Sequence, residues 1–278
     1  PYNDAESQGT FWVNMPDFTS SVESIQLQRG VGTSTNGSSA FGASLNVLTN
    51  AASQEAYAQI SNSIGSFGTV RHSLKFSTGL LNDKIEIAGR LGSIESDGYI
   101  DRASSNLKSY FLQGVYQEGN TLIKALVFGG HEITYQSWFG VDPSTLENDR
   151  TYNFAGEIYD DNGNLSGYYD NQVDNYNQDH YQLHWNQRYD NNWSSSVGLN
   201  YTYGRGFYEE YENSLSLSDL RLDALSVGST SIGETAGVIQ KWLDNDFYVL
   251  TTNLRHQGAQ TDLVFGTLMS NYQGDHFG

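Results

Sequence analysis

Apolar and polar residues alternate along most of this chain, and the alternation predicts β-strands. In one such run, Leu74 and Phe76 alternate with Lys75 and Ser77. A period of two residues places successive side chains on opposite faces of a strand. Runs of this kind predict about nine long strands, at 54–66, 69–80, 84–95, 105–117, 121–134, 178–188, 193–206, 246–255 and 260–270. Most of these strands have one apolar and one strongly polar face, although 110–116 and 122–128 alternate less regularly, so the sequence predicts an all-β fold.

Two kinds of connection separate these strands. Short turn signals occur at 81–83, 118–120, 189–192 and 256–259, whereas longer polar connections cover 96–104, 135–177 and 207–244. Short turns at one end and long loops at the other are typical of an antiparallel outer-membrane β-barrel, with periplasmic turns and extracellular loops. A sandwich or a propeller would show more even spacing. The pattern therefore predicts part of a transmembrane barrel.

Composition agrees with a barrel that has a wet interior. Hydrophobic residues make up 37% of the 278 residues, which is low for a soluble domain of this length but sufficient when only outward positions must be apolar. No apolar run approaches the roughly 18 residues that a transmembrane helix needs. The net charge of −18 argues against nucleic acid as a partner.

A motif in residues 22–50 indicates what fills the barrel. Two alternating segments flank a small-residue loop, and the informative positions are Ile25, Leu27, Arg29, Gly30, Phe41, Gly42, Ala43, Asn46 and Thr49. Their spacing resembles the end of the plug domain in TonB-dependent outer-membrane receptors. The sequence departs from that pattern at Val31, where the family usually has Pro, and at Ala43-Ser44, where it has paired glycines. A soluble β-hairpin with a glycine-rich loop is the alternative interpretation.

The resemblance implies a division of the chain into two parts. Residues 1–52 would be the C-terminal part of the plug, and residues 53–278 the N-terminal part of a barrel that has roughly 22 strands in this family. The first part of the plug and the segment that contacts the inner-membrane TonB complex would lie outside this chain. The implied function is capture and import of a scarce nutrient at the bacterial outer membrane, in contact with lipid and lipopolysaccharide. An iron–siderophore chelate is expected ahead of cobalamin, haem and oligosaccharides.

Aromatic residues are the candidate ligand contacts. Phe11 and Trp12 fall where the resemblance places a loop at the top of the plug, facing the incoming ligand. In the connection 135–177, Tyr135, Trp138, Phe139 and Tyr152 are further candidates, because aromatic rings beside polar groups suit a planar or amphipathic ligand. The alternative for each ring is packing within the protein.

Arg29 is a candidate for holding the plug in place. The resemblance implies that plug arginines pair with acidic groups on the barrel wall, and a guanidinium in the lumen requires such a partner. Glu55 and Glu86 are the acidic residues that we expect to pair with it, by sequence position.

The long connections carry most of the charge. Residues 135–179 contain nine carboxylates against Arg150, a net charge of −8, and residues 207–246 contain eight against two cations, a net of −6. Asp160, Asp161 and Asn162 resemble a fragment of a calcium loop, although the terminal Glu is absent. A hairpin tip at Asn162-Gly163 explains the same residues. We expect no other metal site and no cofactor.

No enzyme signature is present, and we expect a protein that is not an enzyme. The six histidines are scattered, and no nucleophile-elbow or P-loop pattern occurs. Two alternatives to a receptor remain at this point. A passive porin or adhesin-like barrel would have no plug, and a secreted carbohydrate-binding domain would bury its apolar faces against a second sheet.

Overall fold

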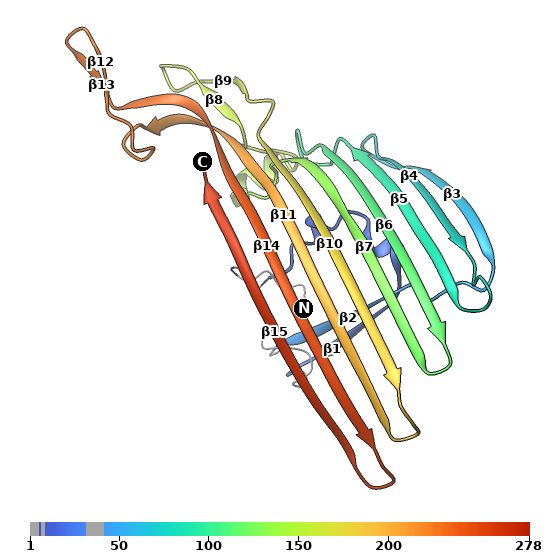
Figure 1. Ribbon diagram of the computed structural model, residues 1–278. Helices are drawn as coiled ribbons and strands as arrows, with labels where there is room; N and C mark the ends of the chain where they lie inside the picture. Colours follow the sequence, from blue (N-terminus) through green and yellow to red (C-terminus); the bar gives the residue numbers. More distant parts are fainter. Residues whose placement is uncertain (1–5, 7–8, 32–41) are drawn as a thin grey trace.

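A nine-stranded antiparallel sheet forms most of the protein, as the sequence predicts. The computed structural model describes residues 6, 9–31 and 42–278, and Figure 1 shows its nine long strands as one curved, open sheet. Its strands are β3 (Ala56–Ile64), β4 (Val70–Thr78), β5 (Ile85–Ser96), β6 (Ser105–Glu118), β7 (Thr121–Tyr135), β10 (Val173–Arg188), β11 (Trp193–Ser216), β14 (Glu234–Gln257) and β15 (Asp262–Phe277). Each pairs with the next in this order, so β3 and β15 form the two edges. We call this sheet the wall.

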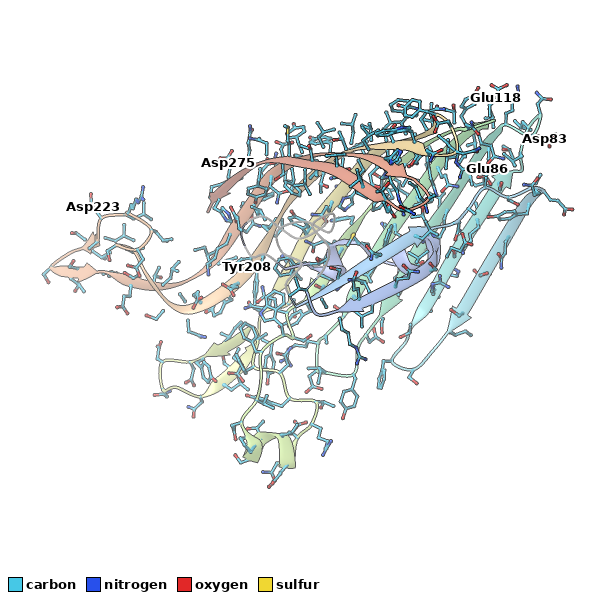
Figure 2. The ribbon with its side chains drawn as sticks, turned by 90° about the horizontal axis from the view of Figure 1, so that it is seen from below. Asp83, Glu86, Glu118, Tyr208, Asp223 and Asp275 are labelled. Atoms are coloured by element: carbon cyan, nitrogen blue, oxygen red, sulfur yellow. The ribbon has the colours of Figure 1, made fainter. Side chains whose placement is uncertain are left out.

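The two ends of the wall differ. Short turns at 79–84, 119–120, 189–192 and 258–261 form the turn end, and the long connections form the loop end together with one short turn at 65–69. Figure 2 shows Asp83 and Glu118 at the turn end and Asp223 far away at the tip of the loop end. The predicted distribution of short and long connections is confirmed.

Four strands, β10, β11, β14 and β15, are clearly longer than the sequence predicts, and β10 begins at Val173 within the predicted loop 135–177. The ladder of β11 and β14 continues to a pair between Ser216 and Glu234, so much of the predicted loop 207–244 is strand. β15 likewise reaches Phe277, whereas the sequence predicts a strand that ends at residue 270. Rings such as Phe207 and Trp242 pair across these extensions, in contact at 4.7 Å. Cross-strand aromatic pairs stabilise a ladder even where charged residues surround them.

The two faces of the wall have opposite character. Polar side chains such as Glu86, Arg90 and Gln113 are buried on the inner face, and Leu91, Leu183 and Leu199 are exposed on the outer face. This matches the apolar and polar faces that the alternation predicts. Among the described helices, none is long and apolar enough to cross a membrane.

A second sheet lies inside the curve of the wall. It consists of β1 (Val22–Arg29) and β2 (Ala43–Thr49), which are antiparallel, with Ile25 opposite Val47. Figure 2 shows the pair within the concave side of the wall. Most of the predicted glycine-rich loop between them, with Phe41 of the motif, lies outside the described residues.

An apolar core joins the second sheet to the wall. Phe18 stacks on Phe128 of the wall at 4.8 Å, and Phe128 contacts Phe111 at 6.0 Å. Met15 and Leu126 complete this buried cluster. Because the core combines residues of the segment before β1 with residues of β6 and β7, that segment is fixed to the inner face of the wall, and Val22 of β1 and Val47 of β2 pack against the same cluster.

Smaller elements lie at the N-terminal end and in the loops. The 3₁₀ helices η1 (Trp12–Asn14) and η2 (Phe18–Ser21) precede β1, and the loop end contains α1 (Pro143–Asn148), β8 (Glu157–Tyr159), β9 (Leu165–Tyr168), β12 (Leu225–Val227) and β13 (Thr230–Ile232). Asp142 caps α1 by accepting hydrogen bonds from the backbone of Ser144 and Thr145. The hydroxyl groups of Ser144 and Thr145 also donate to Asp142, and these side-chain bonds contribute most to holding its pKa well below the usual range.

Candidate functional site

Asp17 connects the segment before β1 to two arginines of the wall. Its carboxylate lies 2.8 Å from Arg90 and 3.1 Å from Arg71, and it accepts a hydrogen bond of 2.5 Å from Ser20. The side chains of Arg90 and Asp17 are 3% and 8% exposed. Charges buried to this degree require partners, so the carboxylate of Asp17 determines whether the two guanidinium groups are tolerated on the inner face.

Arg90 binds two further side chains at the same place. It donates hydrogen bonds to Ser21 Oγ at 2.8 Å and to Ser109 Oγ at 3.0 Å. Gly92 lies alongside, and a Cβ there would approach Arg90 and Asp17 to within 2.6 and 3.1 Å. The glycine therefore leaves room for the ion pair.

A second set of contacts holds the residues that follow β2. Glu86 is 1% exposed and accepts hydrogen bonds from Ser53 N (2.8 Å), Ser77 Oγ (2.6 Å) and Gln113 Nε2 (3.2 Å). Lys124 donates to Thr49 Oγ1 at 2.8 Å and to the carbonyl of Asn50 at 2.9 Å. The connection between the two sheets is therefore attached to the wall on β5 and β7.

The structure does not bring Arg29 together with Glu55 or Glu86. It is exposed at the end of β1 and forms no ion pair with any residue that the structure describes. Glu55 is also exposed, and Glu86 binds the connection after β2 instead. The ion pair has the reverse arrangement, with Arg71 and Arg90 on the wall and the carboxylate in the inner segment. A cluster of cations on the polar faces of neighbouring strands, Arg71 and Lys75 on β4 and Arg90 on β5, was the signal that could have indicated it.

Phe11 and Trp12 are exposed next to the wall. They begin the short segment η1, which lies beside β7 and β10. Pro16 follows and packs over Gly130, where a Cβ would come within 2.4 Å of the proline ring. Both aromatic side chains are therefore accessible on a backbone that the buried residues after them hold in place.

The predicted ligand contacts in the connection after β7 separate into buried and exposed residues. Tyr135 is 6% exposed, and its hydroxyl lies 3.0 and 2.9 Å from the carbonyl oxygens of Ala155 and Tyr169. Tyr152 donates a hydrogen bond to Glu157. Both hydroxyl groups therefore form hydrogen bonds within the connection, and the side chain of Tyr135 is buried.

Trp138 and Phe139 are exposed. They contact each other at 5.9 Å, and Phe139 contacts Phe154 at 4.9 Å. Trp138 is 56% exposed. We call Trp138, Phe139 and Phe154 the aromatic patch, an accessible apolar surface at the loop end.

Glu209 of β11 links the connection between β7 and β10 to the long hairpin formed by β11 and β14. The buried carboxylate accepts hydrogen bonds from Tyr169 (2.5 Å), Asn171 (2.6 Å) and Gln240 (2.5 Å). Burial raises the pKa of Glu209, but the bonds from Gln240, Tyr169 and Asn171 outweigh it and leave the pKa below its usual value. Arg102 adds a cation–π contact, 3.6 Å above the ring of Tyr168. The aromatic patch is thus carried by a hydrogen-bonded frame.

The calcium candidate forms a hairpin tip. Asp160 accepts hydrogen bonds from the backbone of Asn162 and Asn164, and Gly163 has a φ of +80°. The bond from Asn164 makes the largest contribution to lowering the pKa of Asp160. In the described part of the chain, no group of three or more His, Asp or Glu side chains could hold a metal ion. The hairpin interpretation accounts for Asp160, Asp161 and Asn162.

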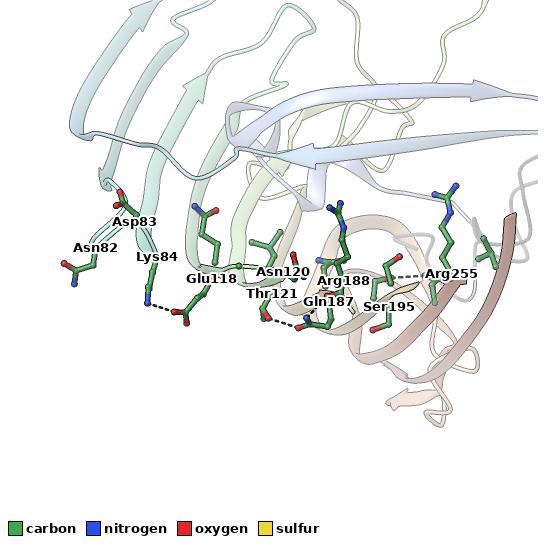
Figure 3. Close-up of a pocket in the computed structure, with 18 residues that line it drawn as sticks. Asn82, Asp83, Lys84, Glu118, Asn120, Thr121, Gln187, Arg188, Ser195 and Arg255 are labelled. Carbon is green, nitrogen blue, oxygen red and sulfur yellow. Dashed lines mark hydrogen bonds and ion pairs between the residues drawn. The ribbon is translucent and has the colours of Figure 1, made fainter. Parts of the chain in front are cut away.

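Two connected cavities follow the inner face of the wall. The first, of about 570 Å³, lies between the β1–β2 sheet and the wall and is bordered by Phe18, Lys124 and His184. The second, of about 1090 Å³, opens at the turn end, where Figure 3 shows Lys84 bonded to Glu118 and Thr121 to Gln187. Three residues border both cavities: Gln117, Leu122 and Asn186. A hollow thus runs from the second sheet to the turn end.

Solved structures with the same fold are outer-membrane receptors and import receptors for iron chelates. No known family model and no curated protein sequence matches this chain. The ferric-catecholate import receptor Fiu of E. coli K12, in its closed form, superposes over 94% of the chain with a TM-score of 0.68 and 14% identity. BauA, the ferric preacinetobactin receptor of Acinetobacter baumannii, covers 91% with a TM-score of 0.67 and 11% identity.

A third similar structure contains a ligand. The ferripyoverdine receptor of the outer membrane of Pseudomonas aeruginosa, bound to ferripyoverdine, covers 93% of the chain with a TM-score of 0.60 and 13% identity. The chain spans 37%, 36% and 33% of the lengths of these three receptors. Over the part of their length that it spans, the chain has the fold of these siderophore receptors.

Proposed function

We propose that this chain is part of a TonB-dependent outer-membrane receptor that binds a ferric siderophore and imports it. The observation that carries the proposal is the β1–β2 sheet held against the inner face of a curved wall. Under this proposal residues 1–52 belong to the plug and residues 53–278 to the barrel. The similar structures support the choice of ligand, because their names specify ferric catecholate, ferric preacinetobactin and ferripyoverdine.

The outer face of the wall supports a position in the membrane. Leu91, Leu183 and Leu199 are exposed on it, and a soluble protein would bury such a surface. About 10 residues of a tilted strand cross a bilayer. The strands of the wall, measured from the turn end, have enough residues to cross the bilayer. β11 and β14 continue well beyond that length at the loop end. Lipid and lipopolysaccharide are the partners that this face would contact.

The alternatives account for less of the structure. A passive porin would have no use for an inner sheet attached through Asp17, Glu86 and Lys124. A carbohydrate-binding sandwich would pack the apolar face of the wall against a second sheet, but the second sheet lies on the polar face. The energy-coupled receptor explains both features.

The ligand would enter at the loop end. Phe11 and Trp12 on the inner segment and Trp138 and Phe139 on the wall side are exposed aromatic residues on ordered backbone. Aromatic rings give large contact area with little loss of rotamer entropy. We assign these four residues to contact with the chelate.

Growth of a deletion strain tests the proposal. The strain is supplied with iron as different ferric siderophores, with haem, or with cobalamin as the limiting nutrient. Failure to grow on one ferric siderophore, restored by the full-length gene, is the expected result. If the strain grows normally on every ferric siderophore but fails on cobalamin or haem, the nutrient that supports no growth is the ligand instead. Normal growth on all sources would reject uptake of these nutrients.

A further inference from the structure

The aromatic patch lies in strongly acidic surroundings. The connection between β7 and β10, residues 136–172, contains seven carboxylates, at positions 142, 147, 149, 157, 160, 161 and 170, against the single cation Arg150. In the hairpin of β11 and β14, residues 207–242 contain six carboxylates against Arg221 and Lys241. Such an excess of one sign of charge produces a negative potential over the loop end.

Two of these carboxylates lie close to the patch along the chain. Asp142 follows Phe139 by three residues, and Glu157 follows Phe154 by three. Three residues span about 10 Å when fully extended, so the Cα atoms of each pair can be no farther apart than that. The Debye length at physiological ionic strength is about 8 Å. Both charges therefore still act on a ligand that contacts the patch.

Asp101 adds a third carboxylate from the connection between β5 and β6. Its amide donates to the carbonyl of Thr151 at 2.8 Å, and its carbonyl accepts a hydrogen bond from Asn153 at 3.0 Å. Asn153 precedes Phe154 of the patch, so the two connections meet there. The side chain of Asp101 is exposed and pairs with no residue that the structure describes. Its charge is therefore available to a ligand.

Few cations could balance these carboxylates beside the patch. The guanidinium of Arg102 lies 3.6 Å above the ring of Tyr168, and Lys241 pairs with Glu210 at 2.9 Å. Arg150 is exposed, but it is one cation among the seven carboxylates of its connection. An anionic ligand would therefore meet carboxylates where it needs guanidinium or ammonium groups.

Ferric chelates differ in charge according to their iron-binding groups. A catecholate binds Fe³⁺ as a dianion and a hydroxamate binds it as a monoanion. A tris-catecholate complex is therefore anionic, whereas a tris-hydroxamate complex is neutral, or cationic when it carries a free amine. An exposed aromatic ring also attracts a cation over its face. Aromatic rings among carboxylates are thus complementary to a cationic chelate and repel an anionic one.

We infer that the loop end selects a ferric chelate of net positive charge, such as a tris-hydroxamate with a free amine, and rejects tris-catecholates. This inference rests on the proposed function and names the class of its ligand. It assigns Trp138 and Phe139 to contact with the cationic group. Asp101, Asp142 and Glu157 supply the field that attracts it.

The charge of the imported chelate tests the inference. The growth test identifies each ferric siderophore that depends on the receptor, with ferrioxamine B, ferrichrome and ferric enterobactin included as cationic, neutral and anionic probes. Electrophoresis at neutral pH then gives the sign of its charge, and migration towards the cathode is the expected result. Dependence of a neutral or anionic chelate on the receptor overturns the inference while the proposed function stands. If no ferric siderophore depends on the receptor, the proposed function itself fails.

A single-residue variant tests whether the field comes from the carboxylates beside the patch. Association of the cationic chelate with the purified full-length receptor is followed by tryptophan fluorescence at low and at physiological salt. The rate should fall as salt rises, and at low salt Asp101→Asn should lower it about twofold, the effect of one unit charge at about 10 Å in water.

Asp83→Asn is the matched control, because it makes the same change at the turn end, far from the patch. It should leave the association rate unchanged. A rate that is independent of salt, or an Asp101→Asn rate equal to that of the unmodified receptor, would overturn the assignment.

Discussion

Asp17 Oδ2 lies 2.8 Å from a terminal nitrogen of Arg90, across the interface between the inner segment and the wall. The same carboxylate reaches Arg71, so one anion pairs with two cations. Replacing Asp17 with Asn keeps the size of the side chain and removes its charge. Breaking a buried pair from one side costs about 3 kcal/mol or more, and we expect Asp17→Asn to lower the thermal unfolding midpoint of the receptor.

Asp83→Asn is the matched control for that prediction. Asp83 is exposed at the turn end, and its φ of +58° suits Asn at least as well. The same chemical change should therefore leave the midpoint unaltered. Equal midpoints for the two variants would show that the Asp17 carboxylate contributes nothing to holding the inner segment.

Glu86→Gln should loosen the connection after β2. The carboxylate accepts three hydrogen bonds, and an amide offers one acceptor oxygen and a donor that faces other donors. A buried group left without a partner costs about 1–3 kcal/mol. We expect faster protease cleavage within residues 50–55. Glu118→Gln, at the exposed rim beside Lys84, should leave the cleavage rate unchanged.

The loop end should lose order in acid because of Glu209. Its folded pKa is below the unfolded value of about 4.3. A depressed pKa contributes stability that is present above the unfolded value and is lost as pH falls through the folded value. Hydrogen exchange of residues 136–172 should therefore accelerate, relative to the strands of the wall, as pH falls through the folded pKa of Glu209. In Glu209→Gln the frame should already be looser at neutral pH, and this acid-dependent step should disappear. A step that persists in the variant would assign it to another carboxyl group.

The aromatic patch should contribute directly to binding. Trp138→Ala and Phe139→Ala should each raise the Kd for the ferric siderophore about tenfold, because central aromatic contacts dominate such interfaces. Tyr189→Ala removes an equally exposed ring at the turn end and should leave the Kd unchanged. Tryptophan-fluorescence titration of the purified receptor measures all three. Unchanged binding in both loop variants would move the ligand site away from this patch.

The wall could be predicted because its signal is local. The alternation is visible within each strand alone. Ile85 and Ile87 could therefore be assigned to one face of a strand, and Glu86 and Arg90 to the other, without knowing which strands pair. The extension of β11 and β14 was missed for the same reason. The charged residues around Phe207 and Trp242 favoured a loop in the sequence. The stabilising contact between the two rings forms only when β11 pairs with β14, so it has no local signal.

The contacts of the inner sheet could not be read in this way. Asp17 and Arg90 are 73 residues apart, and nothing local indicates that they meet. Arg29 was selected because the motif drew attention to it, although its side chain is exposed. Tyr135 and Trp138 have similar chemistry, yet one is buried and the other accessible. Burial of a loop residue depends on which distant carbonyl groups it meets.

The frame around Glu209 has a consequence for how quickly and how tightly a ligand is held. A long loop that orders only on contact loses conformational entropy at that moment, about 1–2 kcal/mol for each backbone residue fixed. Here the connection after β7 is already bonded to the extended ladder through Tyr169, Asn171 and Gln240. The ordering has been completed during folding, so the surface that carries Trp138 and Phe139 is preorganised for its ligand.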